Sequence, residues 1–164
     1  RRSSLSLVSQ CDLLDPFDAI RRDLTRTAYA CLALDLGEAM TERWDPHPEI
    51  FKLLLDTLRA LGAGVDPRLS LTFMEAHLLR LSGIFPPLDS LPLSAGARLS
   101  LQQILKTPPD RMERLGFNRS VEEELRRTLQ GIYRGVLDRE LRSRNFLNAI
   151  GLENLNGVPA IEAA

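Results

Sequence analysis

The sequence predicts an all-α protein, a bundle of about five to six helices, and three observations lead to this fold class. Apolar residues recur at helical spacing in several long segments. Asp-Pro pairs, glycines and other helix-ending signals separate these segments. The chain has 164 residues, 44% of them hydrophobic, which is enough for one domain with a buried core.

The N-terminal residues follow a different pattern. Residues 5–9 alternate between apolar and polar, and the apolar run continues to Leu14, which predicts one short strand. A lone strand finds no partner inside a helical bundle, so unless a preceding part of the protein supplies a sheet, we expect this segment to lie against helices or to pair with another chain. The predicted division is a terminal strand over 1–14, a helical domain over 15–150 and a flexible tail over 151–164.

The first two helices are predicted from their ends. Asp15 and Pro16 supply an N-cap and a first-turn proline, and apolar spacing continues to about Thr41 with a bend near Gly37. The prolines of residues 44–48 predict a loop. The next helix runs from Ile50 to Leu61, and two glycines end it at 62 and 64.

A third helix begins at Asp66 and Pro67, and its apolar residues cover nearly every direction around the axis, which predicts a central, buried position. His77 and Arg80 are three residues apart on this helix and therefore share a side. A buried arginine needs a partner. Two readings stay open: Arg80 receives an acidic group from a ligand, or it pairs with Asp35, Glu38 or Glu75.

The C-terminal part is predicted to hold a short helix over 98–106, a turn or two over 110–115, and a last long helix. That helix begins at a capping box, Ser120 to Glu123, and is expected to continue to Leu147. Gly131 and Gly135 are four residues apart, so we expect another backbone to approach closely there.

Charge is distributed unevenly along the chain, although the net charge is only −1. Residues 1–97 carry 10 basic and 13 acidic side chains, whereas 98–144 carry 11 basic and 7 acidic ones. The basic half predicts either anion recognition or simply a solvated helix surface. Favourable i, i+4 pairs join Glu122 to Arg126, Glu123 to Arg127, Asp138 to Arg142 and Glu140 to Arg144. The better anion contacts lack such partners: Arg98, Lys106, Arg119, Arg134 and Arg139.

Several functional classes find no support in the sequence. The chain has no nucleophile elbow, phosphate-binding glycine loop or metalloprotease motif, so we do not expect an enzyme. Cys11, Cys31, His47 and His77 lack the spacing of a metal site, and no cofactor is expected. No apolar run reaches the roughly 20 residues of a membrane span. Unpaired thiols and no export signal predict a cytoplasmic protein.

Segments in matching order resemble the bacterial DNA repair protein RecO family. They include residues 13–17, Phe73 to Gly83, and Arg139 to Leu147, which reads Arg-Glu-Leu-Arg-Ser-Arg-Asn-Phe-Leu; the likeness covers most of 13–147. Two features of the family have no counterpart here. The family begins with an oligonucleotide-binding (OB) barrel, of which only the short predicted strand before residue 15 resembles a part, the last strand of the barrel. Many members also insert a four-cysteine zinc module at the position where Ser90 directly follows Asp89 in this sequence.

The resemblance implies a non-enzymatic recombination mediator of the RecF pathway. Such a protein binds single-stranded DNA and its binding protein SSB, joins RecR and helps to load RecA at the nucleoid. For this chain we expect mainly the protein-interaction part, with an acidic, Phe-ending SSB tail docked near Arg80 or near Arg142 and Arg144. The candidate partner- and anion-binding residues are Arg80, His77, Arg134, Arg139, Arg142 and Arg144.

Two other functions remain open. A cytoplasmic helical adaptor or regulator unrelated to DNA repair would use its arginines only as a solvated surface. A major-groove reader is less favoured, because Gly131 and Gly135 fall inside its only good recognition helix. Salt-dependent DNA binding would distinguish phosphate contacts from either protein-only role.

Overall fold

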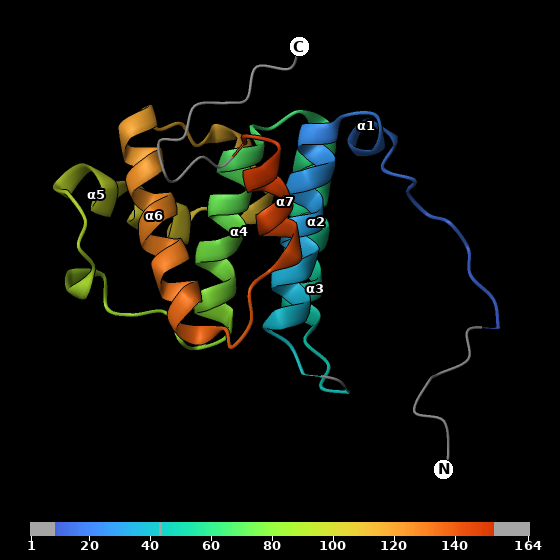
Figure 1. The fold of residues 1–164 in the computed structure, drawn as a ribbon, viewed down its shortest axis with the longest axis horizontal. Helices are drawn as coiled ribbons and strands as arrows, with labels where there is room; N and C mark the ends of the chain where they lie inside the picture. Colours follow the sequence, from blue (N-terminus) through green and yellow to red (C-terminus); the bar gives the residue numbers. More distant parts are fainter. Residues whose placement is uncertain (1–8, 43, 153–164) are drawn as a thin grey trace.

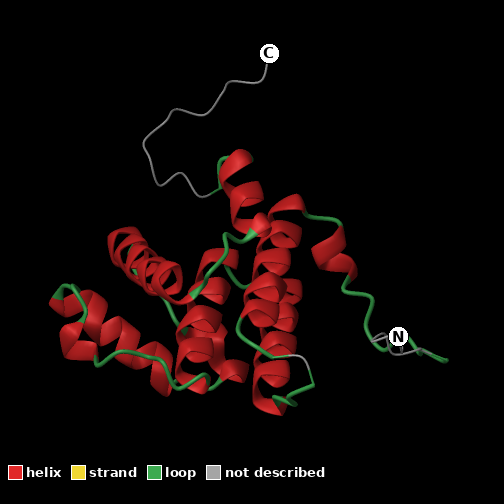
Figure 2. Cartoon of the chain, turned by 60° about the horizontal axis from the view of Figure 1, so that its bottom comes forward, coloured by secondary structure: helices red, strands yellow, loops and turns green. Residues whose placement is uncertain are grey.

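Seven α-helices and two short 3-10 helices form the fold in the computed structural model, which describes residues 9–42 and 44–152 (Figures 1 and 2). The described residues contain no strand, so the all-α class is confirmed. Residues 9–14 of the predicted terminal strand have no regular structure, and residues 1–8 lie outside the described ranges. Most of the predicted tail, from residue 153 onward, also lies outside them.

The first predicted helix is in fact two helices. α1 (Asp18–Arg21) and α2 (Leu24–Ala39) are separated by two residues, and the carboxylate of Asp23 caps α2 by accepting a hydrogen bond from the Arg26 N–H at 3.0 Å. Asp15 is not an N-cap as predicted. It accepts a hydrogen bond from the Phe17 N–H at 2.9 Å in a turn before α1.

α2 and α3 (Pro48–Ala63) pack closely because of one glycine. Gly37 is buried within α2, and a Cβ added there would lie 2.8 Å from Cδ1 of Leu54 on α3. The glycine therefore permits the helix contact, and α2 continues through it to Ala39, close to the predicted end at about Thr41. α3 itself runs through Gly62 and stops at Gly64, whose φ of 95° is a left-handed conformation that favours glycine.

α4 (Pro67–Leu81) is the central helix, as predicted. The Asp66 carboxylate caps it by accepting hydrogen bonds from two backbone N–H groups at 2.8 and 3.3 Å. Every residue from Ser70 to Leu79 is buried. Figure 1 shows α4 in the middle of the molecule, and it contacts α2, α3, α5 and α6.

After α4 the chain forms η1 (Leu88–Ser90), α5 (Ala95–Lys106) and η2 (Pro109–Arg114), which lead to α6 (Arg119–Val136). Asn118 caps α6 by accepting a hydrogen bond from the Val121 N–H at 2.8 Å, so the capping box predicted at Ser120 is wrong. Glu124 of α6 accepts hydrogen bonds from the backbone N–H and hydroxyl of Ser94, the N-cap of α5. These bonds attach α5 to α6.

The predicted last helix is also interrupted. α6 ends at Val136, Leu137 and Leu141 have extended backbone conformations, and α7 (Arg142–Ala149) begins afterwards. α7 lies against α2, beside the central α4 (Figure 1). Because residues 138–141 leave the helix, the i, i+4 pairings predicted for Arg142 and Arg144 are lost.

The expected close approach of another backbone at Gly131 and Gly135 is wrong, since a Cβ built at either glycine meets no described atom of a neighbouring element within 4 Å.

Gly131→Ala should therefore raise the free energy of unfolding by roughly 0.5 to 1 kcal/mol, the difference in helix propensity, as measured by urea denaturation. Gly37→Ala provides the contrast. Its Cβ would displace Leu54, so its stability should be equal to or below wild type. Equal gains from both substitutions would contradict this packing.

A candidate anion-binding pocket between α6 and α7

A pocket of about 460 Å³ opens between the C-terminal part of α6 and α7. Three of the six predicted site residues line it: Arg134, Arg139 and Arg144. They come from α6, the connecting segment and α7, so the interruption at residues 137–141 creates the pocket. Its remaining lining residues are Gln130, Tyr133, Leu137, Asp138, Glu140, Leu141, Asn145 and Asn148.

Tyr133 connects the pocket wall to the protein core. Its side chain is buried, and its hydroxyl donates a hydrogen bond of 2.9 Å to the backbone carbonyl of Glu75 on α4. Burial is the main cause that raises the pKa of Tyr133 well above its usual value, and the nearby Glu75 adds to the effect. The hydroxyl therefore remains protonated and holds α6 against the central helix.

Arg144 points inward to a buried carboxylate. Its Nη2 lies 2.7 Å from Oε1 of Glu75, and the side chains are 14% and 0% exposed. Charges removed from water to this extent require each other, because desolvation is costly for either one alone. Arg144 therefore neutralises Glu75 and fixes α7 to α4. Its charge stabilises the fold and is not freely available to a ligand.

Arg139 contacts two acidic residues of α2. Its Nη2 lies 3.3 Å from Oε2 of Glu38 and 3.8 Å from Oδ1 of Asp35. Asp35 also accepts hydrogen bonds from the backbone N–H and the hydroxyl of Ser143, at 3.3 and 2.7 Å. A carboxylate of α2 thus caps the first turn of α7, whose own N-cap, Leu141, provides no side-chain acceptor.

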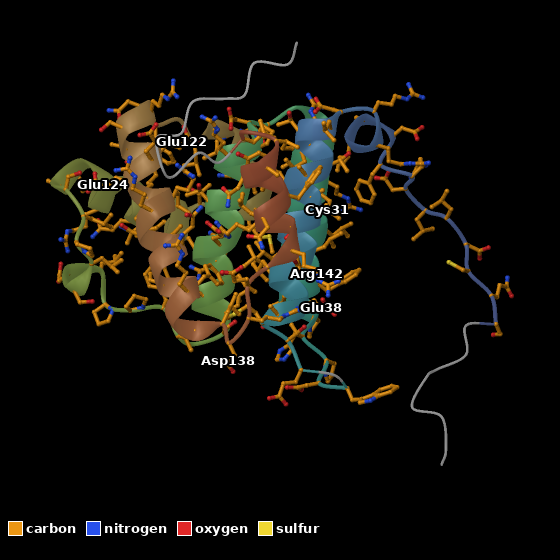
Figure 3. The ribbon with its side chains drawn as sticks, in the orientation of Figure 1. Cys31, Glu38, Glu122, Glu124, Asp138 and Arg142 are labelled. Carbon is orange, nitrogen blue, oxygen red and sulfur yellow. The ribbon has the colours of Figure 1, made fainter. Side chains whose placement is uncertain are left out.

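Arg134 and Arg142 are exposed, and neither forms an ion pair within the described part of the chain. Arg134 lies in the last turn of α6 and lines the pocket. Arg142 instead lines a separate surface groove with Cys31 and Glu38; Figure 3 shows these three on the face formed by α2 and α7.

His77 and Arg80 belong to a different part of the molecule. Nε2 of His77 lies 3.0 Å from the carbonyl oxygen of Ile104, and Nη1 of Arg80 donates a 2.6 Å hydrogen bond to that of Leu105. Nη2 of Arg80 donates to Nδ1 of His77 at 2.9 Å, which fits a neutral ring with its proton on Nε2. The two side chains therefore cap the C-terminus of α5.

The pKa of His77 follows from this arrangement. Burial lowers it below the usual histidine value, the hydrogen bond to Ile104 opposes this, and Arg80 lowers it further. The acids considered for Arg80 are engaged with other arginines, Glu75 with Arg144 and both Asp35 and Glu38 with Arg139. Arg80 therefore pairs with none of these acids; its guanidinium donates to the Leu105 carbonyl and to the His77 ring.

A second basic site was only partly visible from the sequence. A groove of about 580 Å³ between α5 and η2 holds Lys106, Arg111 and Arg114. The sequence analysis names only Lys106 as an anion contact, although the excess of basic residues in 98–144 also includes Arg111 and Arg114. Arg98, predicted as a free anion contact, instead donates to the Leu88 carbonyl at 2.6 Å and to the Asp89 carboxylate at 3.1 Å.

Within residues 9–42 and 44–152, no cluster of His, Cys, Asp or Glu side chains is arranged to hold a metal ion. None of the helices in these ranges is long and apolar enough to cross a membrane.

Known proteins resemble this chain over most of its length. The DNA repair protein RecO of Moorella thermoacetica is 26% identical over 189 positions, covering 94% of this chain and 70% of the relative. RecO of Bacillus pumilus is 26% identical over 89% of the chain and 70% of its own length. RecO of Bacillus velezensis is 32% identical over 89 residues, which are 54% of this chain and 35% of that protein. No solved structure matches.

The alignment with the Moorella protein is longer than the 164 residues of this chain, so the relative has positions without a counterpart here. Residues 21–91, from the end of α1 to the end of η1, match the family described as recombination protein O C terminal. The chain is therefore similar to the RecO proteins over most of its length, and part of it matches their C-terminal domain.

Proposed function

We propose that this chain acts in DNA repair as the helical part of a RecO-like recombination mediator of the RecF pathway. In this role it binds SSB, joins RecR, contacts single-stranded DNA and helps to load RecA at the nucleoid in the cytoplasm. The family match and the relatives named DNA repair protein RecO, which align with 94% and 89% of the chain, support the repair role.

The pocket between α6 and α7 is the proposed binding site for the acidic, Phe-ending tail of SSB. The observation that carries this placement is the position of Arg134, an exposed arginine with no ion pair among the described residues, beside the apolar side chains of Tyr133, Leu137 and Leu141. An aromatic ring fits against the apolar wall, and a guanidinium binds carboxylate oxygens in a forked geometry.

The other charged residues of the pocket differ from Arg134 in the effect that they would have on an acidic ligand. Arg139 and Arg144 already face acidic residues of α2 and α4, which leaves Arg134 as the main cation for a ligand. Asp138 and Glu140 are exposed pocket residues that would repel an acidic peptide. Removing one of these negative charges should therefore have the opposite effect to removing Arg134.

Fluorescence anisotropy with a labelled SSB C-terminal peptide tests the placement. We expect micromolar affinity that requires the terminal Phe, and Arg134→Ala should weaken it about tenfold, or about 1.4 kcal/mol, the scale of one charged hydrogen bond. Asp138→Asn should strengthen binding. Arg22→Ala is the matched control, because Arg22 is also exposed but lines none of the pockets described here.

Each outcome has a definite meaning. Unchanged affinity in Arg134→Ala would exclude this pocket as the tail site while leaving tail binding itself established. Failure of the folded wild-type chain to bind the peptide would contradict the proposed SSB contact in the helical domain. That result would favour the helical adaptor unrelated to DNA repair.

A further inference from the structure

The groove between α5 and η2 combines three cations with uncharged polar groups. Lys106, Arg111 and Arg114 are exposed, and no carboxylate is found among the lining residues whose side chains the structure describes. Glu113 belongs to η2 but does not line the groove. The other lining residues are Leu99, Gln102, Gln103, Thr107, Pro108 and Leu115.

These cations differ from the basic residues of α6. Arg119 and Arg127 each pair with Glu123, at 3.4 and 3.6 Å, so their charge is largely compensated at the surface. Lys106, Arg111 and Arg114 form no ion pair with any described side chain. Three uncompensated positive charges therefore lie together in this groove, whereas Arg119 and Arg127 at the N-terminal part of α6 are paired.

The 3-10 conformation of η2 aligns two of the cations. Residues three apart eclipse each other in a 3-10 helix, and a rise of about 2 Å per residue separates Arg111 and Arg114 by roughly 6 Å along its axis. Met112, between the two arginines, is fully buried and does not line the groove, so it anchors the segment to the core. The guanidinium groups thus project from a fixed base.

We infer that this groove binds the phosphate backbone of a nucleic-acid strand without reading its bases. A strand presents one phosphate for about every 3.4 Å of duplex axis, so two arginines roughly 6 Å apart can contact phosphates of nearby nucleotides. Arginine forks and a lysine point charge both bind phosphate oxygens, and the side-chain amides of Gln102 and Gln103 add hydrogen-bond donors. The lining has no aromatic side chain on which bases could stack.

A strand fits this site better than an acidic peptide with an aromatic end. The groove is a row of exposed cations rather than an enclosed apolar pocket; of its two leucines, Leu99 is 66% exposed and Leu115 is buried. The inference rests on the proposed function in one respect: it gives the helical part of a mediator its own contact with DNA. The site is separate from the pocket proposed for the SSB tail.

The test measures binding of a labelled oligothymidylate to the chain by anisotropy at several salt concentrations. Three phosphate contacts predict a slope of about −2 in log K against log salt for a single strand. Arg111→Glu/Arg114→Glu should reduce affinity at least tenfold and make the slope shallower. Both residues are exposed, so the melting temperature should remain close to wild type.

Arg21→Glu/Arg22→Glu is the charge-matched control. These arginines are exposed at α1, which lies at the other end of the molecule from α5 (Figure 1), and the same change in net charge there should alter affinity less than twofold. An equal loss in both variants would overturn the site, because net charge alone would explain it. Competition by an acidic peptide at equal charge concentration would overturn the assignment to a nucleic-acid strand.

The SSB peptide separates this inference from the proposed function. Arg111→Glu/Arg114→Glu should bind the peptide as wild type does, because the tail is assigned to the other pocket. A chain that binds oligothymidylate through the groove but not the peptide would retain this inference and contradict the SSB contact. A wild-type chain that binds the peptide but no oligothymidylate would overturn the inference alone.

Discussion

Arg144→Ala is expected to lower the free energy of unfolding by about 3 to 5 kcal/mol, the usual cost of removing one partner of a buried ion pair. Glu75 lies at the centre of α4 with a side chain that is 0% exposed, and Arg144 brings its positive charge to within 2.7 Å. Without this cation the carboxylate must remain charged in a poorly hydrated position or take up a proton. Urea denaturation followed by circular dichroism measures the loss.

Two further variants isolate the buried pair. Arg142→Ala changes an exposed arginine at the start of the same helix and should shift stability by no more than about 0.5 kcal/mol. Glu75→Leu/Arg144→Leu removes both charges and should be more stable than Arg144→Ala, because no uncompensated carboxylate remains. If Arg144→Ala costs less than Arg142→Ala, the buried ion pair does not hold α7 in place.

His77→Leu is expected to lower the free energy of unfolding by about 1 to 3 kcal/mol, because it removes a buried hydrogen-bonding group. The ring bonds the carbonyl group of Ile104, accepts from Arg80 and stacks on Phe73, with ring centroids 4.2 Å apart. Leucine would keep the apolar contact but leave the carbonyl without this donor. His77→Gln retains an N–H donor and should lose less stability.

The same residue predicts a dependence on pH. In the unfolded chain His77 has a pKa near 6.5, and burial lowers the pKa in the folded chain, so the unfolded state binds the proton more tightly. Stability from this source is complete above pH 6.5 and decreases as the pH falls from there through the folded-state pKa. Denaturation at pH 7.5 and 5.5 should show a smaller decrease in His77→Gln than in wild type. Equal decreases would contradict a histidine held neutral by the fold.

The predicted arginines have different roles in the structure. Arg144 and Arg80 hold helices in place, Arg139 contacts acidic residues of α2, and Arg134 lines the pocket without an ion pair among the described residues. A variant of Arg144 that loses partner binding would therefore report mainly on the position of α7. Arg134 is the residue at which binding is tested without first disturbing the buried pair.

The sequence by itself determined the fold class, the family and the central helix. The Asp66-Pro67 pair marks the start of α4 because an aspartate cap and a first-turn proline act locally. Apolar residues in all directions around that helix predict complete burial, since no polar face is available for solvent. Segments such as Phe73 to Gly83 were enough to suggest the RecO family, and the family match confirms it.

Only the tertiary structure decided where the last helix ends and which arginines are available. Residues 138–140 contain no glycine or proline, so local preference allows the helix to continue. The chain turns there because residues of α7 then bind two acidic residues that are distant in sequence. Arg144 pairs with Glu75, 69 residues away, and Ser143 donates a hydrogen bond to Asp35, 108 residues away. The local sequence pattern shows the charge of each arginine but does not identify a partner so distant in sequence. That partner decides whether the charge stabilises the fold or remains available for binding.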